Sequence, residues 1–400
     1  MINTDLSTSA HEKMIATYRH LHQNPELSMQ EYKTQEFIEK ELDDIGIEHF
    51  RCGGTGVVAI ERNGDGPTVA FRADTDALPI EEKTGVEYAS TSTGELDGAT
   101  VPVMHGCGHD SHVTAALTAA RLIHEQRDAW AGTIVWIFQP AEETAEGSRA
   151  MVADGLWDKA PKPDIVLGQH VFPFESGTLH YTLNAAMAAA DSLKITLHGE
   201  QSHGSQPQDS IDPIVLGAHI VTRLQTIVGR EIAPLDSAVV TVGTFNAGLK
   251  ENIIPDRAEL KLNIRTLTPD VREQVLNAIT RIVNAEAEAS GAPQPDIEEI
   301  YTFPQLKNHA EEGARVATAL RAELGEDKVI ETPPLMGSED FGHLADSIDV
   351  PSMFWFFGGA AADDDNPAKN HSPRFLPVEE PTLATGVRAA VAAIGAYVAS

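Results

Sequence analysis

Apolar residues in the first 170 positions fall either in short continuous runs or at helical spacing. Helical spacing predicts helices near 10–23, 27–46, 110–126 and 146–155, and the continuous runs predict strands at 57–62, 68–74, 133–139 and 164–170. Continuous apolar strands that alternate with helices are typical of a largely parallel sheet with helices on both faces. This part of the chain is therefore predicted to form an α/β domain.

The pattern changes near residue 187. Strands that alternate apolar and polar residues, separated by helices, follow at 191–199, 238–245 and 258–266, with the helices near 212–230 and 269–290. Such alternation predicts a separate α+β unit with one face of its sheet covered. After a strand at 297–303 the α/β pattern returns, with a helix near 309–324, a strand at 351–359 and a terminal helix near 379–398. We therefore predict a discontinuous α/β domain of residues 1–186 and 303–400, with an α+β domain of residues 187–302 inserted.

Length and charge narrow the classes of function. A chain of 400 residues fits two or three compact units. Its 60 acidic against 29 basic residues give a formal charge of −31, so the attraction to phosphate that supports nucleic-acid binding is missing. We interpret the acidic balance as a solvated surface, and adaptation to salt is the alternative that the sequence leaves open.

Neither a membrane span nor a secretory signal is visible in the sequence. No apolar run reaches the ~18–20 residues that a bilayer requires, and the N-terminal segment has neither a basic region nor the apolar core of a signal peptide. We expect a cytoplasmic protein without membrane contact. Only Cys52 and Cys107 are present, which argues against a disulfide scaffold.

Residues with metal-binding or acid–base chemistry lie where the predicted strands end. At or after strand ends stand Asp74, Asp76, Glu142, Glu143, His170 and His371, and just before a helix, in HGCGHD, stand Cys107 and His109. Ligands of open α/β sheets collect at the carboxyl ends of the strands, because the loops converge there. Thiolate, imidazole and carboxylate together suit zinc or a neighbouring first-row divalent ion. The sequence therefore predicts one shared metal site.

The adjacent acids Glu142 and Glu143 are expected to divide two tasks. In an extended loop, adjacent side chains point to opposite sides. We therefore expect Glu143 to bind metal and Glu142 to face the substrate, where a buried carboxylate takes a proton from water and delivers it to a leaving amine. A pair of solvated loop acids is the structural alternative.

Other catalytic motifs do not occur. In GCGHDS, Ser111 stands where a dinucleotide-binding fingerprint has its third glycine. The sequence has neither a G-x-S-x-G elbow nor a phosphate-binding G-x-x-x-x-G-K-[ST] loop. Nicotinamide-dependent, serine-hydrolase and P-loop functions are therefore set aside.

Eight motifs, in chain order, resemble those of the M20 metallopeptidases, in the branch of aminoacylases, hippurate hydrolases and auxin-conjugate hydrolases. They are HLHQNPELSMQE (20–31), FRADTDALPI (71–80), MHGCGHDSH (104–112), QPAEE (139–143), GQHVFP (168–173), NIIP (252–255), GSEDF (337–341) and NHSPRF (370–375). The resemblance implies a zinc-peptidase-like catalytic domain with an inserted ferredoxin-like lid and dimerisation domain.

The resemblance also implies a set of site residues. Two divalent metal ions per subunit would be held by Cys107, His109, Glu143, His170 and His371, with Glu142 as the general base. Zinc is the expected metal because of the thiolate, while manganese or cobalt also suits the imidazole and carboxylate ligands. Asp76, in DTDALP, is similar to the buried acid that orients a ligand.

Three residues of the inserted domain match less closely. His203 resembles a histidine that in relatives reaches the partner subunit's active site and stabilises the carbonyl oxyanion, although Gln201, Ser202 and Gln208 depart from the family's pattern around it. A structural histidine is the alternative. Asn252 resembles a residue that helps to hold the substrate, and Arg265 suits a free substrate carboxylate or a structural ion pair.

The resemblance and the residues together predict a homodimeric enzyme that hydrolyses the amide bond of N-acyl-L-amino acids. A dipeptidase or carboxypeptidase is the alternative among enzymes, and it would need a site for a free α-amino group. A non-catalytic metal-binding protein is the alternative of a different class. Such a protein would not need an acid beside the metals, whereas Glu142 is present.

Overall fold

The structure is a computed structural model that describes residues 2–399, and its chain divides into two compact units. The first unit contains the residues up to Ala186, then Lys307–Pro333 and the residues from Asp340 onward. The second unit consists of Met187–Leu306 and the short segment Pro334–Glu339. This second unit thus includes residues 334–339, which lie outside the inserted domain predicted at 187–302.

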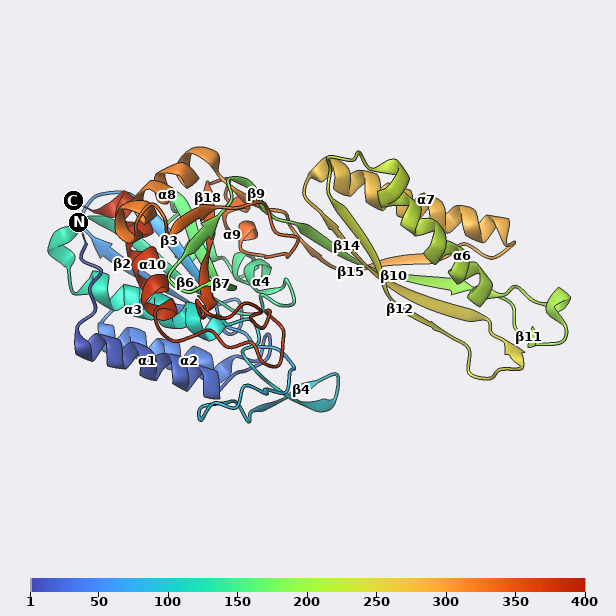
Figure 1. The fold of residues 1–400 in the computed structure, drawn as a ribbon, viewed down its shortest axis with the longest axis horizontal. Helices are drawn as coiled ribbons and strands as arrows, with labels where there is room; N and C mark the ends of the chain where they lie inside the picture. The colour runs from blue at the N-terminus through green and yellow to red at the C-terminus, as the bar shows by residue number, and fades with distance from the viewer. Residues whose placement is uncertain (1, 400) are drawn as a thin grey trace. The chain divides into compact units, whose positions relative to one another are not determined.

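The first unit is built on an eight-stranded sheet with the order β1-β2-β6-β3-β7-β18-β8-β17 (Figure 1). Its strands are β1 (Glu48–Cys52), β2 (Gly56–Asn63), β3 (Thr68–Asp74), β6 (Gly132–Gln139), β7 (Ile165–Glu175), β8 (Leu179–Tyr181), β17 (Val329–Glu331) and β18 (Ser352–Ala360). The central strands β6, β3, β7 and β18 are parallel, whereas β1–β2, β2–β6 and β18–β8 pair antiparallel. The predicted parallel core is confirmed, and the antiparallel margins make the sheet mixed.

Helices cover both faces of this sheet. One face shares a hydrophobic core with α1 (Thr8–Gln23), α2 (Tyr32–Ile45), α3 (His109–His124), α8 (Ala310–Leu324) and α10 (Thr382–Val398). Side chains alternate along a strand, so Phe71 and Ala73 of β3 enter this core while Arg72 points to the other face and pairs with Asp340. There, α4 (Gly147–Ala153) contacts β6 and α9 (Gly342–Asp346) contacts β7, and α5 (Leu156–Lys159) follows α4.

The helix expected from residue 27 begins only at Tyr32. Residues 27–31 instead form a turn that is tied to the sheet, because the N–H of Ala77 donates to the carbonyl oxygen of Glu26 and Leu27 bridges Ala77. The structure also contains short strands that the sequence pattern does not predict, namely β1, β8, β17, β4 (Thr93–Leu96), β5 (Ala99–Pro102), β9 (Asn184–Met187), β11 (Ser202–His203), β13 (Ile253–Ile254) and β16 (Leu306–Asn308). Strands this short contain too few residues to show a periodic pattern of apolar and polar positions.

The second unit is a four-stranded antiparallel sheet with two helices, as the alternating pattern predicts. The sheet order is β12-β14-β10-β15, with β10 (Ala189–His198), β12 (Ala238–Ala247), β14 (Arg257–Thr266) and β15 (Asp296–Phe303). Its core is formed with α6 (Pro213–Thr226) and α7 (Pro269–Ala289). The chain order β10-α6-β12-β14-α7-β15 is the ferredoxin-like order.

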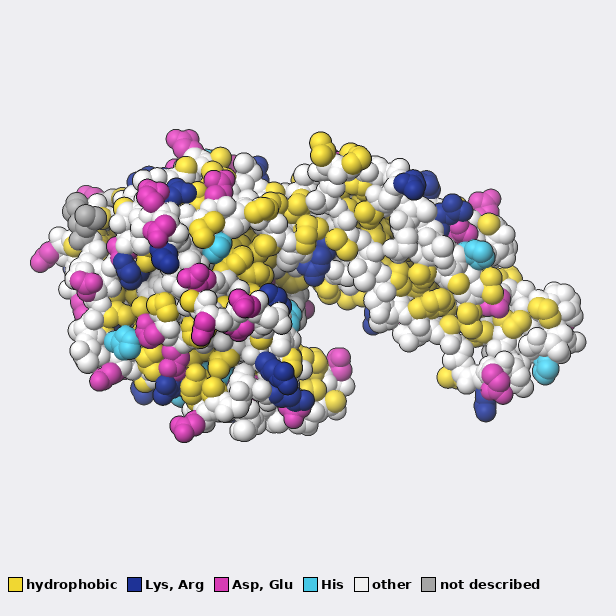
Figure 2. Space-filling model, viewed as in Figure 1, with side chains coloured by type: hydrophobic (Ala, Val, Ile, Leu, Met, Phe, Trp, Pro, Cys, Tyr) yellow, Lys and Arg dark blue, Asp and Glu magenta, His cyan; other side chains and the backbone are white. Residues whose placement is uncertain are grey.

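The surface of the first unit carries both acidic and basic side chains (Figure 2). On the face shown in Figure 2, Asp and Glu side chains are dispersed over this unit, with Lys and Arg between them. Dispersed charge of this kind agrees with a solvated acidic surface. Among residues 2–399, no helix combines the length and the apolar character needed to cross a bilayer.

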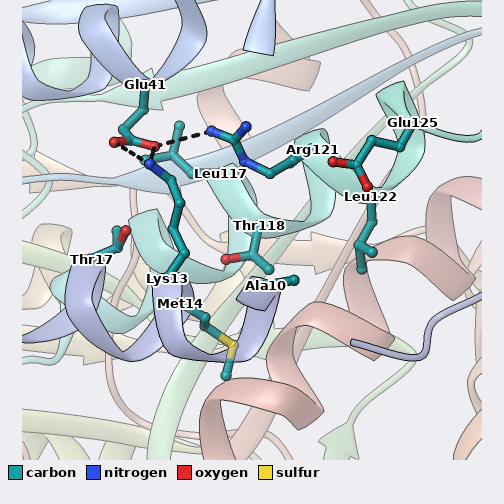
Figure 3. Close-up of a pocket in the computed structure, with 10 residues that line it drawn as sticks. All are labelled: Ala10, Lys13, Met14, Thr17, Glu41, Leu117, Thr118, Arg121, Leu122 and Glu125. Carbon is teal, nitrogen blue, oxygen red and sulfur yellow. Dashed lines mark hydrogen bonds and ion pairs between the residues drawn. The ribbon is translucent and has the colours of Figure 1, made fainter. Parts of the chain in front are cut away.

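A small cavity of about 20 Å³ lies between α1, α2 and α3 (Figure 3). Glu41 of α2 points into it and accepts hydrogen bonds from Lys13 of α1 (2.9 Å) and Arg121 of α3 (3.3 Å). Ligand pockets usually measure ~300–1,000 Å³, so this cavity is too small for an amide substrate. An ion-pair network lines it.

Candidate metal centre

The structure brings the five residues with metal-binding chemistry together at the carboxyl ends of the parallel strands. Cys107, His109 and Glu143 each place one donor atom within 4.8 Å of the others. Cys107 Sγ lies 3.4 Å from His170 Nε2, and Glu143 Oε1 lies 3.3 Å from His371 Nε2. Residues from four separate segments of the chain, one of them β7, therefore line one space.

The loop before α3 needs glycine to present two donors at once. Gly108 has φ +84°, a conformation that favours glycine, and a Cβ at this position would collide with Val171. Gly108 also begins α3 as its N-cap, so His109 is the first residue of the helix. The left-handed residue thus separates Cys107, which ends the loop, from His109 and lets both side chains reach the same space.

Hydrogen bonding defines which nitrogen of His170 faces the cluster. His170 Nδ1 lies 2.7 Å from the carbonyl oxygen of Val171. A carbonyl oxygen only accepts hydrogen bonds, so Nδ1 carries the proton and neutral His170 has its lone pair on Nε2. Burial holds the pKa of His170 well below its ordinary value, which keeps the ring neutral. Nε2 beside Cys107 is therefore a competent metal donor.

Asp76 is linked to two of the candidate ligands. Its Oδ1 lies 3.1 Å from His109 Nδ1, and its Oδ2 accepts hydrogen bonds from the N–H of Glu143 (3.1 Å) and the hydroxyl of Ser28 (2.7 Å). Asp76 is fully buried. Its carboxylate therefore orients the His109 ring and the Glu143 backbone together.

The loop that carries Glu142 and Glu143 is a turn, which corrects the extended loop expected from the sequence. Ala141 has φ +49°, and its N–H donates to the buried carboxylate of Glu31 at 2.9 Å. The N–H of Ala145 then donates to the carbonyl oxygen of Glu142 at 2.9 Å. The two acids therefore separate by the geometry of the turn rather than by strand alternation.

Glu142 lies beside the donor cluster. Its side chain is buried, and its Oε2 lies 3.9 Å from His109 Nε2. Glu143, by contrast, lies between Cys107, His109 and His371. The side chain of His371 is 53% exposed, so the cluster is open to solvent on this side. A small molecule can reach it there.

Negative charge exceeds positive charge in the buried part of this cluster. Burial first, and then the charge of Glu143, raises the pKa of the Cys107 thiol well above its ordinary value. Burial disfavours the protonated form of His109, but the carboxylates of Asp74 and Asp76 raise its pKa to about 10. Neighbouring carboxylates contribute to both shifts, and a bound cation would compensate their charge.

The donor atoms fit a divalent metal. His109 Nε2 and Glu143 Oε1 are buried and make no hydrogen bond, although Glu143 Oε1 lies 3.3 Å from His371 Nε2. A buried polar atom without a hydrogen bond costs about 1–3 kcal/mol. Together with Cys107, His170 and His371 they supply one sulfur, three imidazoles and one carboxylate. This donor set suits zinc and its neighbours. A metal would therefore complete the bonding that the protein leaves open.

A second group of residues also places donor atoms within 4.8 Å of one another. Its members are Asp74, His109, His112 and His170. His112 makes hydrogen bonds through both ring nitrogens, with Asp74 and with the N–H of Val171. Neither of its nitrogens remains for a metal. His112 thus supports the cluster without belonging to it.

The three candidate residues of the second unit have the following surroundings. His203 is exposed, and its Nδ1 lies 2.8 Å from the hydroxyl of Ser205; it pairs with Ile253 in the short β11–β13 ladder, next to Asn252. Arg265, in β14, donates to Asn263 (3.0 Å) and to the carbonyl oxygen of Met336 (2.8 Å). The β11–β13 ladder therefore groups His203 with Asn252, while Arg265 is engaged within its own unit.

Sequence reasoning missed several residues that support the cluster. Glu31 holds the Ala141 turn, and His22 links α1 to α3 through Asp110 at 2.6 Å. Asn370 donates to the Cys107 loop. Glu31 and Asn370 stand in the motifs at 20–31 and 370–375, so position within a motif was the available signal, but their partners are distant in sequence.

Comparisons with known proteins find relatives that cover most of the chain. Residues 70–396 match the description Peptidase family M20/M25/M40. The chain is 38% identical over 360 residues to an N-acetyl-L-cysteine deacetylase of Bacillus subtilis (87% of this chain, 80% of the relative). It is 36% identical over 384 residues to thermostable carboxypeptidase 2 of Saccharolobus solfataricus (94% and 93%). A solved structure, the Bacillus subtilis YXEP protein, described as a dinuclear metal binding peptidase from the M20 family, superposes with a TM-score of 0.79 at 30% identity (97% and 99% covered).

Proposed function

This chain belongs to peptidase family M20/M25/M40, and from that premise we propose that it is a dinuclear-metal amidohydrolase that cleaves N-acyl-L-amino acids. It is a hydrolase of linear amides, as its relatives are named. The observation that carries the proposal is the convergence of one thiol, three imidazoles and a carboxylate on one space, with a further buried acid beside them.

Cys107, His109, Glu143, His170 and His371 would hold the two metal ions, with zinc favoured by the thiolate. When bound, divalent ions polarise the substrate carbonyl and make water more acidic. Asp76 keeps the His109 ring and the Glu143 backbone in place through its two carboxylate oxygens. The ligands are thus oriented before substrate arrives.

Glu142 is the proposed general base. Its buried carboxylate takes a proton from the attacking water and then delivers it to the amine that leaves, so one residue serves both steps. Its Oε2 lies near the donor cluster, 3.9 Å from His109 Nε2. A general base must lie this close to the cluster to reach the attacking water. The turn fixed by Glu31 holds Glu142 in this place.

The inserted unit would supply substrate contacts. We assign His203 to stabilisation of the carbonyl oxyanion, Asn252 to substrate binding and Arg265 to the substrate carboxylate. The ladder between β11 and β13 supports a joint role for the first two. Action of the chain as a homodimer through this unit is part of the proposal.

A carboxypeptidase is the second candidate, because the thermostable carboxypeptidase 2 of Saccharolobus solfataricus is 36% identical over 94% of this chain. The two activities share a free carboxylate on the amino acid that leaves. They differ on the acyl side, where a peptide substrate carries a free α-amino group or a longer chain. Discrimination between them therefore depends on the acyl pocket.

The test is a substrate panel with the enzyme reconstituted in zinc, manganese or cobalt. N-acetyl, N-benzoyl and longer N-acyl amino acids are each paired with the dipeptide that carries the same C-terminal amino acid. We expect the N-acyl amino acids to be hydrolysed with the higher kcat/KM. Higher kcat/KM for the dipeptides would favour the peptidase, and no turnover of either set with any metal would refute the amidohydrolase.

A further inference from the structure

The side chain of Asn370 joins segments that carry three of the proposed ligands. Its Nδ2 lies 3.3 Å from the carbonyl oxygen of Cys107, 3.7 Å from Cys107 Sγ and 3.3 Å from the carbonyl oxygen of Val171. The backbone N–H of His371, the next residue, donates to the carbonyl oxygen of Gly106 at 2.7 Å. The Cys107 loop, the β7 residue that follows His170 and the His371 loop therefore meet at one amide.

The chemistry of these partners defines which way the amide points. Two of them are backbone carbonyl oxygens, which only accept hydrogen bonds, and the third, a metal-binding thiolate, is also an acceptor. Nδ2 must therefore face Cys107 and Val171, because the reversed amide would set an oxygen against three acceptors. In this orientation Asn370 Oδ1 is buried without a hydrogen-bond partner. A buried oxygen without a hydrogen bond costs free energy. Its presence here indicates that the two N–H donors of Asn370 are what this position requires.

We propose that Asn370 is a positioning residue for the Cys107 thiolate: its amide holds Sγ toward the bound metal and draws electron density from the sulfur. The inference rests on the metal centre proposed above. Hydrogen bonds to a ligating atom set its orientation and donor strength, and loss of such a partner typically costs ~10–100-fold in metal affinity. A hydrophobic side chain of the same size would fill the space and supply neither effect.

Cobalt(II) alone is a suitable probe, because a thiolate ligand gives it a sulfur-to-cobalt charge-transfer band in the near ultraviolet. The expected result for Asn370→Leu is a shift of this band to longer wavelength, since a sulfur without the N–H donor holds its electrons less tightly. Competition with a chelator should show cobalt affinity lowered roughly 10-fold or more. Asn370→Asp keeps the shape but offers no N–H donor, and its band should shift in the same direction.

Controls separate this inference from the proposed function and from misfolding. Asn366→Leu makes the same replacement at an exposed position of the same loop and should leave band and affinity unchanged. Thermal unfolding of the metal-free variants checks their fold. If Asn370→Leu does not fold, the charge-transfer band of Asn370→Asp tests the proposal instead. An unshifted band in a folded variant overturns the role of Asn370 alone. A wild-type protein without any such band overturns thiolate ligation, and this inference with it.

Discussion

Nε2 of His112 accepts a hydrogen bond from the backbone N–H of Val171 at 2.7 Å. Because Nε2 accepts, the proton of the neutral ring is on Nδ1, which faces the carboxylate of Asp74. Burial lowers the pKa of His112, so the neutral form is the one that persists. Since Val171 follows His170, this bond fixes the backbone from which His170 extends. His112 is thus a support for a ligand rather than a ligand.

Replacement of His112 by Phe should therefore destabilise the fold but leave the number of bound metal ions unchanged. The ring volume is kept, but the N–H of Val171 and the carboxylate of Asp74 each lose one hydrogen bond, which should lower the free energy of unfolding by roughly 3 kcal/mol. Metal analysis should still find two ions per chain at saturating metal. Loss of one ion would make His112 a ligand. His219→Phe, at an exposed histidine, is the control.

Glu142→Gln should separate chemistry from metal binding. Glutamine has nearly the same shape but cannot take up the proton, so kcat should fall by ~10²–10⁴-fold while both ions remain bound. Steady-state kinetics and metal analysis of the same preparation measure this. Glu146→Gln changes an exposed acid of the same loop and should leave kcat unchanged. Turnover near the wild-type rate would remove Glu142 from the mechanism.

Cys107→Ser should lower metal occupancy, because a neutral hydroxyl is a far weaker ligand than a thiolate. The measurement is metal content after dialysis against limiting zinc. Cys52 supplies a matched control: it is the other cysteine of the sequence, is buried, and donates to the carbonyl oxygen of Met151 at 3.4 Å. Cys52→Ser should retain full occupancy. Equal occupancy in Cys107→Ser would show that the thiol does not bind metal.

The central strands and the donor cluster were predictable because both depend on local signals. Residues 134–138 are all apolar and Glu143 stands in the loop that follows them, while His170 ends the predicted strand at 164–170, although β7 itself continues to Glu175. Parallel strands then bring their carboxyl ends to one edge, whatever the sequence distance between them. Asp74 likewise stands at the end of β3. Its carboxylate, however, pairs with Arg72 and His112 rather than with a metal.

What could not be predicted depends on partners far apart in sequence. Glu31 contacts Ala141, and Asn370 contacts Cys107, across more than a hundred positions with no periodicity to connect them. The turn at Ala141 was also missed, since its positive φ occurs at a residue that rarely adopts it. A buried acceptor, Glu31, stabilises that conformation, and nothing near Ala141 in the sequence indicates it.

Glu31 gives a pH dependence that can be tested. Its carboxylate accepts hydrogen bonds from the N–H of Ala141 (2.9 Å) and the hydroxyl of Thr55 (2.5 Å). Burial, and then the charge of Asp76, raises the pKa of Glu31 from 4.5 to about 7. Between these two values the folded protein keeps a proton that the unfolded chain has lost, so stability should fall as pH rises through this window. The loss should amount to roughly 3 kcal/mol.

Glu31→Gln should remove this slope. Glutamine can still accept from Ala141 with its oxygen and can donate to the Thr55 hydroxyl with its nitrogen, so both contacts survive in a group that does not titrate. Denaturant unfolding of the metal-free protein at pH values from 4.5 to 8 measures the effect without the pH dependence of metal binding. The variant should gain stability relative to wild type as pH rises from 4.5 to about 7, and the difference should then stay constant. Glu36→Gln, at an exposed acid of α2, should follow the wild-type curve, and parallel curves for wild type and Glu31→Gln would show that Glu31 does not titrate in this range.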